Sequence, residues 1–250
     1  MDNAIIIQAR VGSTRFPNKM TIPFHNGKGM LHFLLSRMVK AGLPAPIILA
    51  IPDSPANDVL EEIGTQLNIN VFRGSENDVL QRFIDAATLH KATRIIRVCA
   101  DNPFLDTQSL INLIDTLKND PSDYISYCLT DGTPTIKTHY GFWAEAVRLN
   151  ALKTVAGLTD EKLYREHVTN YIYAHPKAFT RSCLRLDPAI EANPWARFTV
   201  DTAQDFENMK NLAADLPTSS TLSPIQLINH IANFPGIKTS MQAEINKNQK

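Results

Sequence analysis

The sequence predicts an α/β fold with a mostly parallel sheet. Short apolar runs rich in β-branched residues alternate with longer segments whose apolar residues recur at helical spacing. Continuous apolar runs are typical of strands buried on both faces of a sheet, and their alternation with helices indicates βαβ units. The 250 residues, 44% of them hydrophobic, are enough for a substantial buried core.

The first hundred residues contain strands and helices in alternation. The patterns predict strands at residues 4–7, 47–51, 69–72 and 94–99. They predict helices at residues 31–42, 59–67 and 75–87, and Ser75 is the expected N-cap of the last one. A long polar loop at residues 11–29 separates the first strand from its helix.

The pattern becomes irregular after about residue 121. Residues 129–140 are rich in Thr, Gly and Pro, and we expect residues 129–185 to form an excursion from the sheet. Strand-like patterns occur at residues 124–128, 181–186 and 197–200, and helical ones at residues 202–212 and 224–231. We expect residues 1–235 to form a single domain and residues 236–250 to form a polar tail, frayed from residue 241.

The overall charge argues against two classes of partner. Lys and Arg number 25, and so do Asp and Glu, so the formal net charge is zero. A neutral chain is not expected to coat nucleic acid or an anionic membrane through its overall field. Any anion that the protein binds must therefore be held by a local site.

Two further features of the sequence concern the compartment. No apolar run approaches the roughly 18 residues needed to cross a bilayer, and the first residues lack a basic signal-peptide region, so we expect a cytoplasmic protein. The three cysteines, Cys99, Cys128 and Cys183, are odd in number and far apart. That spacing fits neither a disulfide framework nor a zinc knuckle, and we expect buried or half-buried thiols.

The loop after the first strand has the chemistry of a phosphate site. Between Arg10 and Lys19 it contains small residues and a further cation, Arg15. Backbone N–H groups and cations at the carboxyl edge of a parallel sheet suit a nucleotide triphosphate. The loop is neither a Walker A motif nor a GxGxxG motif. The alternative is a solvated surface loop.

Two aspartates follow strand-like segments. Asp101 comes after the strand at residues 94–99, and Asp201 comes after residues 197–200. Two carboxylates on neighbouring strand ends would suit a Mg²⁺ ion shared with substrate phosphates. For Asp201 alone, the competing interpretation is the N-cap of the following helix.

Several ordered blocks of this sequence resemble a known family. The opening block reads Ile-Ile-Gln-Ala-Arg-Val-Gly-Ser-Thr-Arg-Phe-Pro-Asn-Lys. It is similar to the signature of the cytidylyltransferases that make CMP-activated acidic sugars, the CMP-Kdo and CMP-acylneuraminate synthetases, and most of all to their SpsF-like subgroup. The matching blocks lie at residues 6–19, 73–83, 97–106, 165–169 and 198–202.

The resemblance implies a glycosyltransferase-A-like nucleotidyltransferase fold, a homodimer, and Mg²⁺-dependent transfer of CMP from CTP to an anionic small-molecule acceptor, with release of pyrophosphate. By resemblance, Asp101 and Asp201 would bind the metal. The implied catalytic residues are Arg10, Arg15, Lys19, Asp101 and Asp201. The implied nucleotide-binding residues are Gln8, Ala9, Arg10, Gly12, Ser13, Thr14, Arg15, Lys19, Arg73, Gly74 and Asp78. In-line displacement at phosphorus needs no covalent enzyme intermediate, so alignment and charge neutralisation would suffice.

One region departs from the subgroup's pattern. Trp143 stands where the subgroup usually has an acidic residue, in a segment expected to face the acceptor. A tryptophan there either stacks on a sugar ring or fills space in the core. The expected acceptor-side residues are Trp143, Glu145, Arg165 and His167. A metal site at His167 and His175 is disfavoured because no third ligand lies nearby in the sequence.

Two other functions compete with the cytidylyltransferase. A glycosyltransferase that consumes a nucleotide sugar has the same scaffold, but the sequence contains no D-x-D motif. A degenerate member would bind a nucleotide or sugar without turnover. The sequence leaves three classes of acceptor as alternatives: an acidic sugar, a sugar phosphate and a phosphonate.

Overall fold

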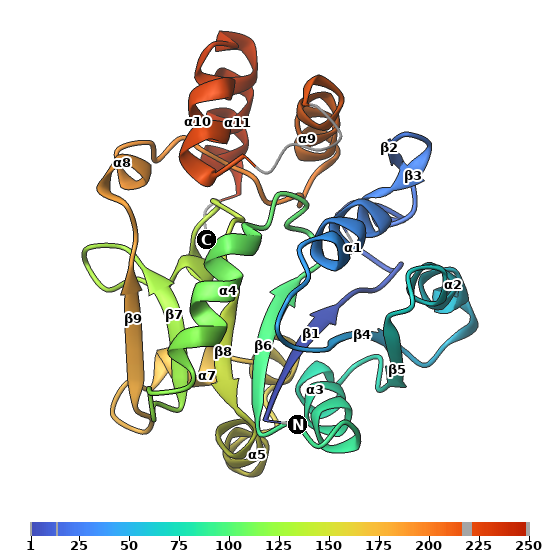
Figure 1. The fold of residues 1–250 in the computed structure, drawn as a ribbon, viewed down its shortest axis with the longest axis vertical. Coiled ribbons are helices and arrows are strands. Elements are labelled where there is room, and N and C mark those ends of the chain that lie inside the picture. The colour runs from blue at the N-terminus through green and yellow to red at the C-terminus, as the bar shows by residue number, and fades with distance from the viewer. Residues whose placement is uncertain (1, 14, 217–221, 249–250) are drawn as a thin grey trace.

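A computed structural model describes residues 2–13, 15–216 and 222–248 (Figure 1). Within these residues, seven strands form one sheet in the order β5-β4-β1-β6-β8-β7-β9. Six of them take part in parallel pairs, which link β5, β4, β1 and β6 and also β7 with β9, whereas β8 runs antiparallel to both neighbours. The strands are β1 (Asn3–Gln8), β4 (Ile47–Pro52), β5 (Asn70–Gly74), β6 (Arg94–Cys99), β7 (Tyr124–Cys128), β8 (Glu145–Arg148) and β9 (Arg181–Arg185). A small hairpin comprises β2 (Pro23–His25) and β3 (Lys28–Gly29).

The central strands are buried on both faces, as their unbroken apolar runs predict. In β1, Ile5 and Ile7 join one hydrophobic core, whereas Ala4 and Ile6 join another on the opposite face. The first core is covered by α1 (Met30–Lys40), α2 (Asp58–Gln66), α4 (Thr107–Thr116), α8 (Pro188–Glu191), α9 (Ala203–Asp215), α10 (Pro224–Ala232) and α11 (Pro235–Lys247). The second is covered by α3 (Val79–Leu89), α5 (Leu149–Leu158) and α7 (Asn170–Ala174), and α6 (Lys162–Glu166) packs beside α3.

The four expected strands of the first half are confirmed, but the start of α3 is not where we expected it. The helix begins at Val79, and its N-cap is Asp78, whose Oδ1 accepts a hydrogen bond of 2.9 Å from the Gln81 N–H. Ser75 instead accepts from the Asp78 N–H at 3.0 Å. The expectation of Ser75 as the N-cap is therefore wrong, because Asp78 offers the stronger acceptor three residues closer to the apolar stripe.

In the second half, strands β7 and β9 are confirmed, and two other expectations are wrong. Residues 197–200 are extended but join no strand of the sheet; instead, the Phe198 N–H donates to the His139 backbone oxygen at 2.9 Å. Residues 241–247 do not fray, because they complete α11, where Met241 is fully buried. In Figure 1, α9, α10 and α11 gather at one end of the molecule, beyond the carboxyl ends of β1 and β6.

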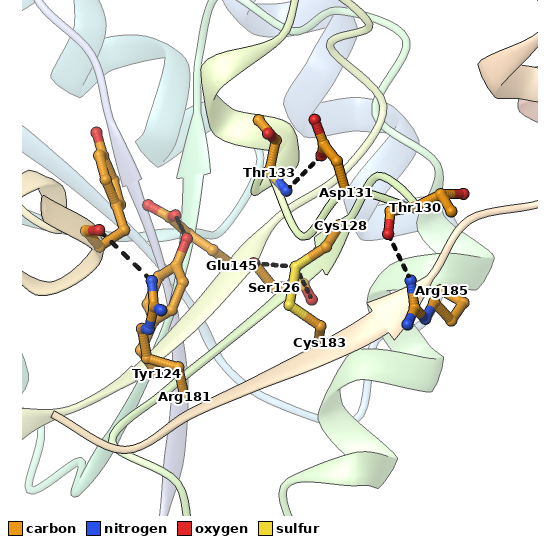
Figure 2. Close-up of a disulfide and its surroundings, with 11 residues drawn as sticks. Tyr124, Ser126, Cys128, Thr130, Asp131, Thr133, Glu145, Arg181, Cys183 and Arg185 are labelled. Carbon is orange, nitrogen blue, oxygen red and sulfur yellow. Dashed lines mark hydrogen bonds between the residues drawn. A yellow bond between two sulfur atoms is a disulfide. The ribbon is translucent and has the colours of Figure 1, made fainter. Parts of the chain in front are cut away.

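The cysteines also correct an expectation. Cys128 at the end of β7 and Cys183 in β9 form a disulfide, with their Cα atoms 5.6 Å apart (Figure 2). Fifty-five residues separate them in the sequence, and the parallel pairing of β7 with β9 brings them together. Cys99 at the end of β6 takes no part in this disulfide and is partly buried, as expected.

No helix among the described residues is long and apolar enough to cross a membrane.

Candidate active site

The polar loop after β1 is held in a defined shape by its own backbone and by a neighbouring strand's loop. The Val11 N–H donates to Asn57 Oδ1 at 3.0 Å, and the Val11 backbone oxygen accepts from both Ser13 and Asn18. Asn18 adopts a left-handed conformation, with φ of 61°, which asparagine tolerates better than most residues. The ring of Phe16 packs against Phe206 of α9. The loop is therefore folded back over the sheet edge rather than freely solvated.

This loop forms one wall of a cavity of about 330 Å³ at the carboxyl ends of β1 and β6. The expected nucleotide-binding residues that line it are Gln8, Ala9, Arg10, Ser13, Arg15 and Lys19. Asp101 and Asp201 line it as well. Ligands of open α/β folds bind at this edge of the sheet. Most of the cations that we expected to bind the triphosphate therefore lie there.

A second cavity, of about 560 Å³, opens beside the first. Its walls come from the segment after β7, from the residues around Trp143 and from α6 and α7, with Lys137 and Tyr173 among them. Six residues line both cavities: Arg15, Arg97, Cys99, Asp101, His167 and Asp201. The two cavities therefore meet at the two aspartates.

Lys19 and the two aspartates form the centre of this junction. The Lys19 side chain is only 9% exposed; its Nζ donates to the Val200 backbone oxygen at 2.6 Å and lies 3.7 Å from Asp101 Oδ2. The Val200 N–H donates to the Asp101 backbone oxygen at 2.9 Å. This bond fixes the segment before Asp201 against the segment that carries Asp101, so the two carboxylates come from adjacent stretches of chain.

Asp201 does not cap the following helix. The N-cap of α9 is Thr202, in a capping box with Asp205. Asp201 Oδ2 instead accepts from Arg197 Nη2 at 3.2 Å and from Thr199 Oγ1 at 3.3 Å. Arg197 is fully buried, and Asp205 and Asp201 raise its pKa although burial opposes them. The competing N-cap interpretation of Asp201 is wrong, and its carboxylate is held toward the cavities.

The donor set at the junction fits a divalent metal that is shared with a substrate. Among the described residues, no group of three or more His, Cys, Asp and Glu side chains is arranged to hold a metal ion by itself. Two hard carboxylate oxygens, from Asp101 and Asp201, border both cavities. Mg²⁺ is commonly bound by one or two carboxylates, with phosphate oxygens and water completing its shell.

Gly141 brings the wall of the larger cavity close to this centre. It adopts φ of +67°, and a Cβ there would lie 2.8 Å from the Phe198 backbone. Only glycine fits so close an approach at this conformation. Trp143, two residues later, lines the larger cavity but is 8% exposed, with its ring against Tyr127, Tyr140 and Phe142. Its ring is mainly a packed wall of the cavity.

Several expected site residues lie outside the cavity walls. Arg73 forms ion pairs with Asp53, Asp58 and Glu61 at 3.1, 2.8 and 2.6 Å. Arg165 pairs with Asp78 at 3.1 Å, so these two expected residues contact each other. The expected residues that line neither cavity are Gly12, Arg73, Gly74, Asp78, Glu145 and Arg165. Thr14 lies outside the described residues.

His167, which the sequence resemblance places on the acceptor side, lines both cavities. Burial lowers its pKa, and the charges of Arg97 and Arg10 lower it further against the opposing effect of Glu166. Glu166 itself forms an ion pair of 3.0 Å with Arg10. The imidazole therefore favours its neutral form near neutral pH.

Our sequence analysis missed two buried arginines. Arg97 lies in β6 and lines both cavities. Arg82 lies on the buried side of α3, where burial and then the charge of Arg10 lower its pKa to about 10. An arginine within an otherwise apolar strand or helix face could have identified both residues. Burying such a charge costs desolvation energy, so an arginine at a buried position indicates a specific partner or ligand.

Comparison with known proteins shows the family of the chain. The family model described as "Cytidylyltransferase" matches residues 4–243. The chain belongs to the cytidylyltransferase family. It is 32% identical to the spore coat polysaccharide biosynthesis protein SpsF of Bacillus subtilis over 97% of this chain and 99% of the relative. The resemblance inferred from the sequence blocks is confirmed.

Solved structures support the same fold. A cytidylyltransferase from Leptospira borgpetersenii superposes with a TM-score of 0.83 at 28% identity, over 95% of this chain and 96% of that one. CMP:2-keto-3-deoxy-manno-octonic acid synthetase complexed with CTP gives 0.63 at 15% identity, over 86% and 99%. Rv0371c of Mycobacterium tuberculosis, in complex with manganese, gives 0.58 at 14% identity, over 84% and 99%. The predicted nucleotidyltransferase fold is confirmed.

Proposed function

We propose that this cytidylyltransferase transfers CMP from CTP to an acidic sugar, a sugar phosphate or a phosphonate and releases pyrophosphate. The observation that carries the proposal is the meeting of two cavities at Asp101 and Asp201. The smaller cavity, lined by cations of the loop after β1, is the proposed nucleotide site. The larger one is the proposed acceptor site. The product would serve the biosynthesis of a surface polysaccharide or glycoconjugate.

Each cation of the nucleotide cavity has a distinct place in this proposal. Arg10 is half-buried and Arg15 is exposed, and both would bind phosphate oxygens directly. Ser13 and the loop backbone would supply further donors. Lys19 is buried beside Asp101, so it would meet the triphosphate at the bottom of the cavity. Loss of these cations should weaken triphosphate binding more than monophosphate binding.

Asp101 and Asp201 would hold Mg²⁺. The bound ion would offset the negative charge of the phosphates and of the leaving pyrophosphate. The protein's own contribution is the fixed orientation of the carboxylates, through Lys19 at Asp101 and through Arg197 and Thr199 at Asp201. An acceptor hydroxyl in the larger cavity would then face the α-phosphorus across the junction, and alignment would account for much of the rate.

We infer further that the enzyme is a cytoplasmic homodimer. The support is the resemblance to the acidic-sugar cytidylyltransferases. Light scattering after size-exclusion chromatography tests the dimer, and a molar mass of one chain would contradict it.

Thermal unfolding with CTP, UTP, ATP and GTP, each with and without Mg²⁺, tests the nucleotide half of the proposal. A ligand at about a hundred times its dissociation constant stabilises a protein by about 2.7 kcal/mol, which is readily detected. We expect CTP with Mg²⁺ to raise the midpoint most. Preference for UTP would favour the glycosyltransferase alternative, and binding without turnover would favour the degenerate scaffold.

A further inference from the structure

A buried ion pair lies behind the wall of the larger cavity. Arg97 in β6 stands opposite Glu145 in the antiparallel strand β8, and Arg97 Nη1 donates to Glu145 Oε1 at 2.6 Å. The two side chains are 8% and 3% exposed. Burying two charges costs desolvation energy that their attraction does not always repay. Such a pair is therefore a candidate for a functional role rather than a simple stabilising contact.

The Glu145 carboxylate is fully engaged inside the protein. Its Oε1 also accepts from Thr169 Oγ1 at 2.6 Å, and its Oε2 accepts from the Tyr124 hydroxyl at 2.5 Å. Burial raises the pKa of Tyr124 well above its usual value, so the phenol stays a donor. Glu145 borders neither cavity, but it contacts two residues that line the larger one, Arg97 and Thr169.

Arg97 itself faces the cavities with unused donors. Among the described residues, its Nε is buried without a hydrogen-bond partner, and its Nη2 donates to no protein group. These two nitrogens share one edge of the guanidinium and point to the same side. Burial opposes the charge of Arg97, but Cys99 and Glu145 raise its pKa, so it stays a cation. An arginine edge of this kind matches an anionic oxygen pair.

The remaining charges of the larger cavity agree with an anionic ligand. Lys137 and Arg15 line it without an ion-pair partner among the described residues. The acids that line it, Asp101 and Asp201, face Lys19 and Arg197 at 3.7 and 3.2 Å. The cavity thus offers more unneutralised positive than negative charge, with Arg97 at its junction with the nucleotide cavity.

We propose that Arg97 is the residue that binds the anionic group of the acceptor, and that Glu145, Tyr124 and Thr169 are the positioning residues that orient it. This inference rests on the proposed function, because it assigns the larger cavity to the acceptor. It gives Glu145 a role behind the cavity rather than in contact with the acceptor. It makes Arg97, at the border of the two cavities, a determinant of acceptor choice, and it predicts a larger effect on acceptor binding than on CTP binding.

Two of the test variants keep the buried charges balanced, and a third removes the negative charge alone. Arg97→Lys keeps the cation but removes the guanidinium edge, and the double variant Arg97→Gln with Glu145→Gln removes both buried charges together. Glu145→Gln alone leaves Arg97 without its anchor. Arg94→Lys is the matched control, because Arg94 lies in the same strand, lines neither cavity and donates to the Asp120 backbone oxygen. Circular dichroism and thermal unfolding verify that each variant folds.

Pyrophosphate release and calorimetric binding are measured with CTP, Mg²⁺ and three anionic probes: 2-keto-3-deoxy-manno-octonic acid, glucosamine 6-phosphate and 2-aminoethylphosphonate. The wild type should bind or turn over at least one of them. For that probe, Arg97→Lys and the double variant should raise the acceptor KM about tenfold or more, roughly the value of one charged hydrogen bond. The KM for CTP should stay within about twofold, and the control should match the wild type.

The outcomes separate this inference from the proposed function. An unchanged acceptor KM in the folded double variant overturns the role of Arg97 and leaves the cytidylyltransferase activity standing. A wild type that CTP stabilises but that none of the three probes binds also overturns it. If CTP with Mg²⁺ neither binds nor reacts, the proposed function itself fails. An equal loss for CTP and acceptor would make Arg97 a structural residue.

Discussion

The two cavities differ in how the chain builds them. The nucleotide cavity takes most of its cations from one loop, residues 10–19, which follows a single strand. The proposed acceptor cavity draws on seven separate segments: the loop after β1, β6 with the residues after it, the stretch after β7, the residues around Trp143, α6 with α7, the stretch before α9, and Asn248 after α11. A site that is local in the sequence can be recognised from spacing, whereas a site assembled from distant segments cannot. The following experiments test whether the two cavities bind different substrates.

The largest effects are expected where the two cavities meet. Asp101→Asn and Asp201→Asn should each lower turnover by roughly a hundredfold or more, because each removes a carboxylate from the proposed metal site. Steady-state kinetics with CTP and Mg²⁺ measure the loss, and circular dichroism confirms folding. Near-normal activity in either variant would remove that aspartate from the metal site.

A smaller effect that is specific to the nucleotide side is expected for Lys19→Ala. Loss of one charge-assisted contact should weaken CTP binding by roughly tenfold and CMP binding less, because Lys19 lies beside Asp101 at the bottom of the smaller cavity, where the β- and γ-phosphates would lie on the side away from the acceptor. Calorimetry with both nucleotides is the measurement. An equal loss for CTP and CMP would contradict the placement of Lys19 near the leaving phosphates.

On the acceptor side, Trp143→Phe should raise the acceptor KM by roughly threefold to tenfold, since an aromatic ring contact contributes about 0.5–1.5 kcal/mol. Phenylalanine keeps most of the packing against Tyr140 and Phe142. The KM for CTP should not change. The reverse pattern would place Trp143 on the nucleotide side.

The smallest effect concerns pH. The pKa of His167 is lowered in the folded protein, so its protonation favours the unfolded state. Its contribution to stability is present above about pH 6.5, the usual histidine value, and is lost as the pH falls through the folded-state pKa. His167→Gln should therefore flatten the decline in stability on the acid side, as measured by denaturant unfolding between pH 5 and 8. A steeper decline would show that the His167 pKa is raised instead.

The same contrast explains which features the sequence could predict. The strands of the first half are continuous apolar runs, so their positions and the carboxyl-edge site were readable from local pattern. The loop from Arg10 to Lys19 contains its cations and small polar residues in one continuous stretch of the sequence. These predictions needed no knowledge of long-range pairing.

The failures arise from long-range pairing. The disulfide between Cys128 and Cys183 depends on the pairing of β7 with β9 across 55 residues. Residues 197–200 have the alternation of a strand, yet their hydrogen bonds go to His139 and Asp101. The link between Arg97 and Glu145 exists because β8 enters the sheet beside β6, an antiparallel insertion that periodicity alone does not reveal.

The central claim is CMP transfer across the junction of the two cavities, and radiolabelled CTP tests it most directly. With Mg²⁺ and each anionic probe, label in the α-phosphate should pass to the acceptor, while label in the γ-phosphate should appear in pyrophosphate. Asp101→Asn is the inactive control. Transfer of the α-label to no acceptor, or consumption of a nucleotide sugar instead of CTP, would contradict the account.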